Sequence, residues 1–169
     1  MERLEAERAL DTAAEAFDRV TDRLLGRGRT RRLFEGRWLG HTFHALLTDF
    51  VEGPWMAATF LDVFGPPDSN ASARRLLGFG LAVVPLAHLS GLADWQQADH
   101  EGARRVGVVH ALTVSAATAF YAGSYLARRR GDQRRAKTLS LAAGVIALAD
   151  GYLGGHLSHV RGVAVGEQV

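Results

Sequence analysis

The chain of 169 residues has no cysteine, two methionines and four prolines. Without cysteine it forms no disulfide, no thiolate-bound iron–sulfur cluster and no cysteine-based zinc site. Any metal ion or haem iron would have to be bound by histidine, carboxylate or methionine. The chain also has no large excess of either positive or negative charge, because 20 basic and 18 acidic residues leave a net charge of +2. The net charge therefore indicates no class of partner.

The mean hydropathy of −0.02 is typical of a soluble protein, but the average hides an uneven distribution. Charged residues concentrate in the first forty positions and in short connections, and three later segments are strongly apolar: 76–93, 106–127 and 138–157. As a helix, segment 106–127 would span about 33 Å, which matches the hydrocarbon core of a bilayer. A soluble bundle would need polar stripes that 76–93 and 106–127 lack.

A fourth candidate span, 45–64, is weaker because it contains Asp49, Glu52 and Asp62. Beside three clear spans, we expect these acids to face the bundle interior or to lie near the membrane surfaces, where a charge costs less. The sequence therefore predicts an all-α fold, a four-transmembrane-helix up-down bundle in the inner (plasma) membrane.

Residues 1–37 are predicted to form an amphipathic, Arg-rich segment ahead of the transmembrane domain, residues 38–169. Apolar residues recur with a helical period from Glu2 to Leu25, at Leu4, Leu10, Ala14, Phe17, Val20 or Thr21, and Leu24. Such a helix would lie on the membrane surface, pair with a partner or cover the end of the bundle. The five arginines between positions 27 and 37 are expected among anionic headgroups rather than on nucleic acid.

Residues 1–26 do not have the apolar core of a secretory signal, so we expect both termini to be cytoplasmic. The arginine and lysine residues near the membrane number eight on each side, so the positive-inside rule does not decide the orientation.

The histidines show the strongest functional pattern. Four spans with short connections alternate in direction, so the start of the first and third and the end of the second and fourth share a membrane face. All seven histidines fall at this face: His41, His44, His88, His100, His110, His156 and His159. We expect His41, His100 and His159 to be interfacial or solvated. His88 and His110 lie inside spans, where an ionisable group suggests function, although the backbone or Ser90 could simply satisfy them.

Small residues recur every four positions in two spans, at Gly107, Ala111, Ser115, Ala119 and Gly123, and at Ala147, Gly151 and Gly155. Such stripes let helices approach closely in lipid. The alternative interpretation is that these small residues leave room for a flat cofactor.

Four motifs, HTFHALLTDFVEGPW, GLADW, RRVGVVHA and GYLGGHL, follow one another between Gly40 and Val165. In this order they resemble an uncharacterised bacterial membrane family, domain of unknown function 2231, whose first motif reads like HPLHPMLVDFPIGLW. The matching residues are His41, His44, Asp49, Gly53, Trp55, Gly91, Asp94, Trp95, Arg105, Gly107, His110, Gly154, Gly155 and His156. Thr42 and Ala45 depart from the family's prolines, which makes a helical start at His41 easier. Some members are fused to a Rieske domain, which implies electron transfer by association.

Three functions are compatible with these features. The first is a b-type cytochrome-like redox subunit, in which haem b takes two imidazoles from different helices. Its candidate ligands are His44, His110 and His156, with His88 in addition. Arg105 lies at the correct face to pair with haem propionates.

The second function is a non-haem metal site, with ligands from His44, His110, His156, Asp49 and Asp94. The third is a structural or assembly subunit of a larger membrane complex. No catalytic residue is assigned, because GLADW lacks the nucleophile of G-x-S-x-G. The expected partners are membrane lipids and a Rieske-type or other redox protein. A homo-oligomer and a subunit of a complex both fit, and we expect no nucleic-acid partner.

Overall fold

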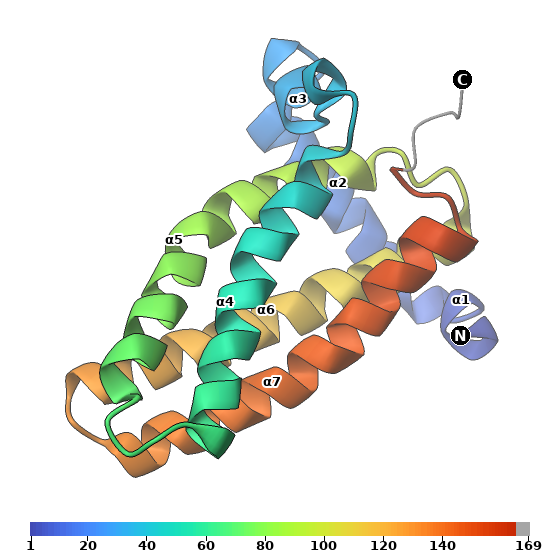
Figure 1. Cartoon of the computed structure of the whole chain (residues 1–169). Coiled ribbons are helices and arrows are strands. Elements are labelled where there is room, and N and C mark those ends of the chain that lie inside the picture. The colour runs from blue at the N-terminus through green and yellow to red at the C-terminus, as the bar shows by residue number, and fades with distance from the viewer. Residues whose placement is uncertain (165–169) are drawn as a thin grey trace. The chain divides into compact units, whose positions relative to one another are not determined.

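The computed structural model describes residues 1–164, apart from the side chain of Arg37. Its elements are α1 (Glu2–Glu5), the 3-10 helix η1 (Arg8–Leu10), α2 (Asp11–Leu25), α3 (Arg29–Phe34), the 3-10 helix η2 (Arg37–Leu39), α4 (Phe43–Phe64), α5 (Asn70–Trp95), α6 (Glu101–Arg129), α7 (Gln133–Gly155) and the π-helix η3 (His156–Val160) (Figure 1). No residue within this described part forms a β-strand, so the predicted all-α fold class is confirmed.

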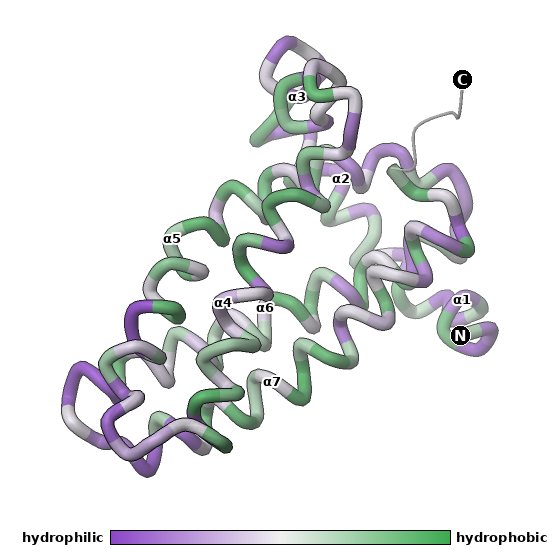
Figure 2. The backbone as a smooth tube through the Cα atoms, viewed as in Figure 1, coloured by the Kyte–Doolittle hydropathy of each residue, from purple (hydrophilic) through white to green (hydrophobic). Residues whose placement is uncertain are grey.

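Within residues 1–164, three helical stretches are long and apolar enough to cross a membrane: Asn70–Trp95, Glu101–Arg129 and Gln133–Val160. They contain the three apolar segments predicted from the sequence. The helix α4 forms over 22 residues as expected, but its acidic residues lower its hydropathy and it does not meet the same criterion. Figure 2 shows hydrophobic residues along the long helices and hydrophilic ones in the N-terminal segment and the tight connections.

The tight connections have a local cause. A side chain at Gly65 would come within 2.4 Å of the Leu61 carbonyl oxygen, and Pro66 follows directly, so α4 ends there. Between α6 and α7, Gly131 has a φ of +80°, a conformation that favours glycine. The Asp132 amide then donates to the Ala127 carbonyl at 3.0 Å and closes the end of α6.

The chain divides into two compact units, and the boundary between them falls within each of the four long helices. The first unit comprises Met1–Leu46, Leu86–Leu112 and Gly151–Val169; the second comprises Leu47–Pro85 and Thr113–Asp150. The predicted division into residues 1–37 and 38–169 stays a prediction, and residues 165–169 of it lie outside the described residues.

In the first unit, the N-terminal segment is not one continuous helix. The side chain of Glu7 accepts from the Ala9 amide, and α1, η1 and α2 follow one another with breaks. Of the predicted apolar stripe, Leu10, Ala14 and Phe17 pack in a cluster with Trp95 and Val108. Of the two alternatives predicted for the next turn, Thr21 is buried and Val20 is exposed. The last turn differs from the prediction, because Leu25 is buried there and Leu24 is exposed. Among the three alternatives, these contacts favour a helix that covers helix ends of its own unit.

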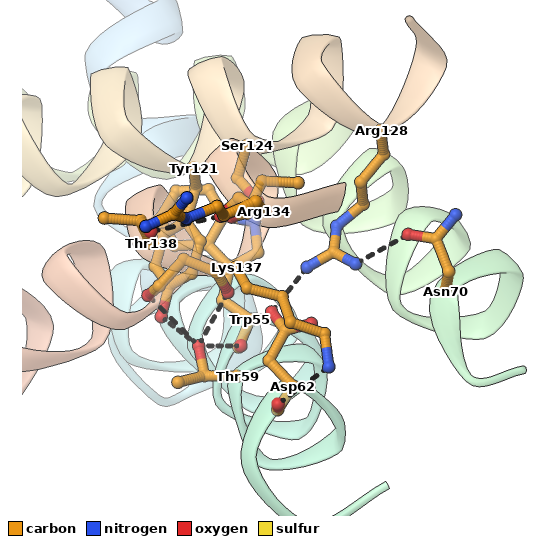
Figure 3. A network of polar contacts seen from close by, with 12 residues as sticks. Trp55, Thr59, Asp62, Asn70, Tyr121, Ser124, Arg128, Arg134, Lys137 and Thr138 are labelled. Atoms are coloured by element: carbon orange, nitrogen blue, oxygen red, sulfur yellow. Dashed lines mark hydrogen bonds and ion pairs between the residues drawn. The ribbon is translucent and has the colours of Figure 1, made fainter. Parts of the chain in front are cut away.

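The second unit is centred on Trp55 and Tyr121, whose ring centroids lie 4.5 Å apart. The Thr59 hydroxyl bonds the Trp55 carbonyl, the Tyr121 hydroxyl at 3.0 Å and the Ser140 hydroxyl at 3.3 Å (Figure 3). This network gives the buried hydroxyls partners that lipid could not supply.

A buried ion pair joins Arg128 to Asp62, with the two side chains 0% and 2% exposed (Figure 3). Arg128 also donates to Asn70 Oδ1 at 2.8 Å. The sequence predicted that acids of this span would turn inward or lie near its ends, and Asp62 is buried as expected. Asp49, by contrast, is exposed.

The small-residue stripe predicted for α6 is wrong in its middle, because Ser115 and Ala119 are exposed. The buried positions there are Ala117, Tyr121 and Ser124. Packing of the large Tyr121 ring against Trp55 sets the rotation of the helix, which a count of small residues does not detect.

Candidate functional site

The first unit contains the start of α4, the end of α5, the start of α6 and the end of α7 together with η3. If the four helices alternate in direction, these four ends are predicted to lie together on one face. Their common membership of the first unit confirms this grouping. All seven histidines belong to this unit and none to the second. His41, His100 and His159 are exposed, as expected for interfacial or loop positions.

His44 lies in the first turn of α4, which begins at Phe43 rather than at His41. Its Nδ1 lies 3.0 Å from the Ala87 carbonyl oxygen and 3.2 Å from the Ser90 hydroxyl, both on α5. A carbonyl only accepts, so Nδ1 must carry a proton, and in the neutral ring Nε2 is the atom with the lone pair. Ser90, considered at the sequence level as a partner for His88 or His110, bonds His44 instead.

Two histidines and one tryptophan lie directly against glycines of neighbouring helices. A Cβ on Gly91 would be 3.0 Å from Cε1 of His44, and one on Gly154 would be 3.3 Å from Cε1 of His110. A Cβ on Gly107 would come within 2.7 Å of the Trp95 ring. Each pair joins residues of two different motifs, so the four motifs meet in space through rings packed on glycines.

His88 and His110 are both close enough to His44 to interact with it electrostatically. His88, His110 and His44 are each partly buried. The first unit therefore brings three of the four candidate haem ligands into one neighbourhood, contributed by α4, α5 and α6.

The fourth candidate ligand, His156, is bound elsewhere. Its Nε2 lies 2.8 Å from Oε1 of Glu5, and the same carboxylate is paired with Arg161. The bonds from Arg161 first, and from His156 second, hold the pKa of Glu5 below its usual value. His156 thus contacts the N-terminal segment.

Arg105, the candidate propionate partner, is also bound to this segment. Its Nε and Nη2 donate to the two oxygens of Asp11 at 2.7 and 3.0 Å, and its Nη1 donates to the Glu5 carbonyl at 2.8 Å. This fork of charged hydrogen bonds lowers the pKa of Asp11. The side chain of Arg105 is 8% exposed.

Of the candidate carboxylates, Asp94 is buried and accepts from Gln97 Nε2 at 3.3 Å. Asp49 is exposed on α4. Within residues 1–164, no group of three or more histidine or carboxylate side chains is arranged to hold a metal ion. Two shallow surface pockets lie in the described part of the chain. One is lined by Arg29, Arg32, Leu33 and Trp38, the other by Asp18, Asp22, Arg27, Gln96 and Arg104, and no candidate histidine lines either of them.

Sequence reasoning did not identify the carboxylates of the N-terminal segment as part of this region. Glu5 and Asp11 bind His156, Arg161 and Arg105, and Asp18 pairs with Arg104 and accepts from Trp95 Nε1 at 2.9 Å. The available signal was the spacing of Asp11 and Asp18, which are two turns apart and therefore on one helix face. These acids give α2 a polar edge beside its apolar contact with Trp95.

Comparison with known proteins agrees with the motifs. A family described as Predicted membrane protein (DUF2231) matches residues 40–167. Neither a curated protein nor a solved structure matches the chain. The family match covers most of the chain and includes all four motifs, and three described helices are apolar and long enough to cross a membrane. The chain therefore belongs to the DUF2231 family of membrane proteins.

Proposed function

We propose that the protein is a membrane redox subunit for electron transfer that binds a metal centre through His44 and His110. Haem b is the first choice for this centre, and another metal ion is the second. The observation that carries the proposal is the hydrogen bonding of the His44 ring. Its Nδ1 donates to the Ala87 carbonyl, which leaves Nε2 as the basic atom of the neutral ring. A metal-binding imidazole uses this same arrangement, in which the second nitrogen is held by a carbonyl.

The surrounding residues would position such a ligand pair. Ala87 and Ser90 hold the His44 ring in one orientation, and Gly91 and Gly154 leave the two rings room against α5 and α7. When bound, haem iron would supply one-electron redox chemistry. Two imidazoles are what haem iron commonly takes from a helical bundle, whereas non-haem sites use three or more protein ligands. The described residues offer no group of three, which favours haem over a non-haem ion.

The residues fit the expected site only in part. His156 and Arg105 are bound to Glu5 and Asp11, so while the N-terminal segment is in place His156 would not be suited to hold haem iron and Arg105 would not be suited to hold a propionate. His88 remains the additional ligand candidate, and Asp94 a group that could orient a ring. Asp49, exposed on α4, is the least suited of the proposed metal ligands.

A structural or assembly subunit is the second candidate. It is favoured by the number of charged contacts that tie helix ends to the N-terminal segment. In that case the histidines would serve packing, and the partner would be another membrane subunit.

The absorption spectrum and metal content of the purified wild-type protein separate the two. We expect a Soret band that His44→Ala and His110→Ala each abolish or shift, because a metal bond is lost. His100→Ala, in an exposed loop, should change neither the spectrum nor the metal content, and His156→Ala should retain the cofactor. A colourless, metal-free wild-type protein would exclude the redox proposal and leave the assembly subunit.

We also propose that α4 is a fourth span, that the amphipathic α2 covers the helix ends where they reach the membrane surface, and that both termini are cytoplasmic in the inner membrane. The pairing of α4 residues Trp55 and Asp62 with α6 supports a span, because it removes polar groups from lipid. Two reporters can be fused at Val169, which lies outside the described residues: one that is active only in the cytoplasm and one that is active only in the periplasm. We expect the cytoplasmic reporter alone to be active. Activity of the periplasmic reporter alone would contradict this orientation.

The proposed redox partner is a Rieske-type or another electron-transfer protein, reached as part of a complex or a homo-oligomer. Copurification of a redox protein with the wild-type chain, and its loss on His110→Ala, would support that assignment. Copurification unchanged by His110→Ala would favour the assembly role.

A further inference from the structure

We propose that Arg29, Arg32, Leu33 and Trp38 form a binding site for the headgroup of an anionic phospholipid. These four side chains line a shallow surface pocket of about 330 Å³ in the first unit. The site lies outside the family match, which begins at residue 40. The proposal depends on the chain being a membrane protein and not on the proposed metal centre.

The two arginines are available to a ligand. Arg29 and Arg32 are exposed, and neither guanidinium group makes a hydrogen bond or ion pair with any residue that the structure describes. Their neighbour Arg31 differs, because its Nε is paired with Glu35 at 2.8 Å. Residues 29 and 32 are separated by three positions in α3, so their guanidinium groups share one face of the helix. Two such groups provide a strong site for a phosphate.

The floor of the pocket is apolar. Leu33 is 53% exposed and Trp38 is 61% exposed, an unusual exposure for such large side chains. The Trp38 ring is nevertheless fixed, because its Nε1 donates to the Leu33 carbonyl at 3.0 Å and its ring packs edge-on against Phe43 with centroids 5.9 Å apart. The exposed ring is therefore presented in a defined position.

Cationic groups beside an exposed, held tryptophan match the chemistry of a phospholipid, which has a phosphate next to apolar chains. Tryptophan is enriched at the membrane interface, and arginine near the surface attracts anionic lipid. Phe43 begins α4, so the pocket is directly connected to the start of a proposed span. Nucleic acid has the phosphate, and its bases could stack on Trp38, but it offers no acyl chain for the exposed Leu33, so lipid is the better match.

The test uses the full chain reconstituted in phosphatidylcholine vesicles with brominated phosphatidylglycerol, whose bromines quench nearby tryptophan fluorescence. Trp55 and Trp95 are 1% and 7% exposed, so the quenched signal should come from Trp38, and Trp38→Phe identifies the remaining background. We expect brominated phosphatidylglycerol to quench more than brominated phosphatidylcholine at equal fractions. The preference should fall about five- to sixfold for each arginine removed, and roughly thirtyfold in Arg29→Gln/Arg32→Gln.

Arg74→Gln/Arg75→Gln is the matched control, because it removes the same charge from an exposed pair in the second unit. It should keep the lipid preference. Equal quenching by both lipids in the wild type, or equal loss in the two double variants, would overturn the proposal. Relief of quenching by millimolar inorganic phosphate or by a DNA oligonucleotide would also overturn it, in favour of a free phosphate or nucleic-acid site. None of these results depends on the absorption spectrum that tests the proposed metal centre, so either proposal can fail without the other.

Discussion

The imidazole of His110 lies against Gly154, where a methyl group would come within 3.3 Å of the ring carbon Cε1. His44 and Gly91 repeat this relationship at 3.0 Å. In each pair a histidine near the start of one helix occupies the space that a glycine leaves near the end of another. Glycines permit such close approach where lipid provides no hydrophobic drive for association.

Gly91→Ala should therefore lower the stability of the protein. The added methyl group would force the His44 ring or its helix to move, and overpacking of this kind costs about 1–3 kcal/mol. Gly154→Ala should cost less, because its contact is longer. Thermal unfolding in detergent measures both. Gly151→Ala is the control on the same helix as Gly154, since no atom lies within 4 Å of a Cβ there; an equal loss in all three variants would contradict the explanation.

Asp62→Asn should be strongly destabilising. It leaves the buried guanidinium of Arg128 without its counter-charge, and removing one partner of a buried ion pair costs about 3–5 kcal/mol. The double variant Asp62→Leu/Arg128→Met should recover most of this loss, because neither charge then remains buried. Denaturant titration would show the difference. Arg129→Gln, at an exposed neighbouring position, should stay within about 0.5 kcal/mol of wild type.

Glu5→Gln should destabilise the N-terminal segment at pH 7 but not in acid. The carboxylate of Glu5 has a pKa below its usual value of 4.5 because Arg161 and then His156 bind it. Its stabilising contribution is complete above pH 4.5 and is lost as the pH falls through the lowered pKa. The thermal midpoints of variant and wild type should therefore converge on acidification. Glu2→Gln, at an exposed position, should show no such trend, and a pH-independent difference for Glu5→Gln would refute the ion-pair explanation.

A chain beginning at Arg29 should still insert into the membrane, because the long apolar helices are intact. It should nevertheless unfold at a lower temperature than the full chain, since Arg104 and Arg161 lose the carboxylates that bind them and Arg105 keeps only Glu101. Membrane fractionation and thermal unfolding measure the two effects separately. Failure to reach the membrane would show that residues 1–28 take part in insertion.

The sequence by itself determined the membrane helices and the grouping of the histidines. Long apolar segments must form helices in lipid, because only a helix satisfies its own backbone polar groups there. Short connections then force alternate directions, so positions such as His44, His110 and His156 can be assigned to one group of helix ends before any side chain is placed. The four motifs likewise identified the family.

Only the tertiary structure decided what each of these residues contacts. Helix rotation depends on packing, and the fit of Tyr121 against Trp55 overrode the small-residue stripe expected on α6. Contacts far apart in the chain, such as Glu5 with His156 or Asp11 with Arg105, leave no periodic pattern in the sequence. The candidate site was thus predictable as a set of histidines, but its division into the ring–glycine pairs and the residues bound by the N-terminal segment depends on three-dimensional packing.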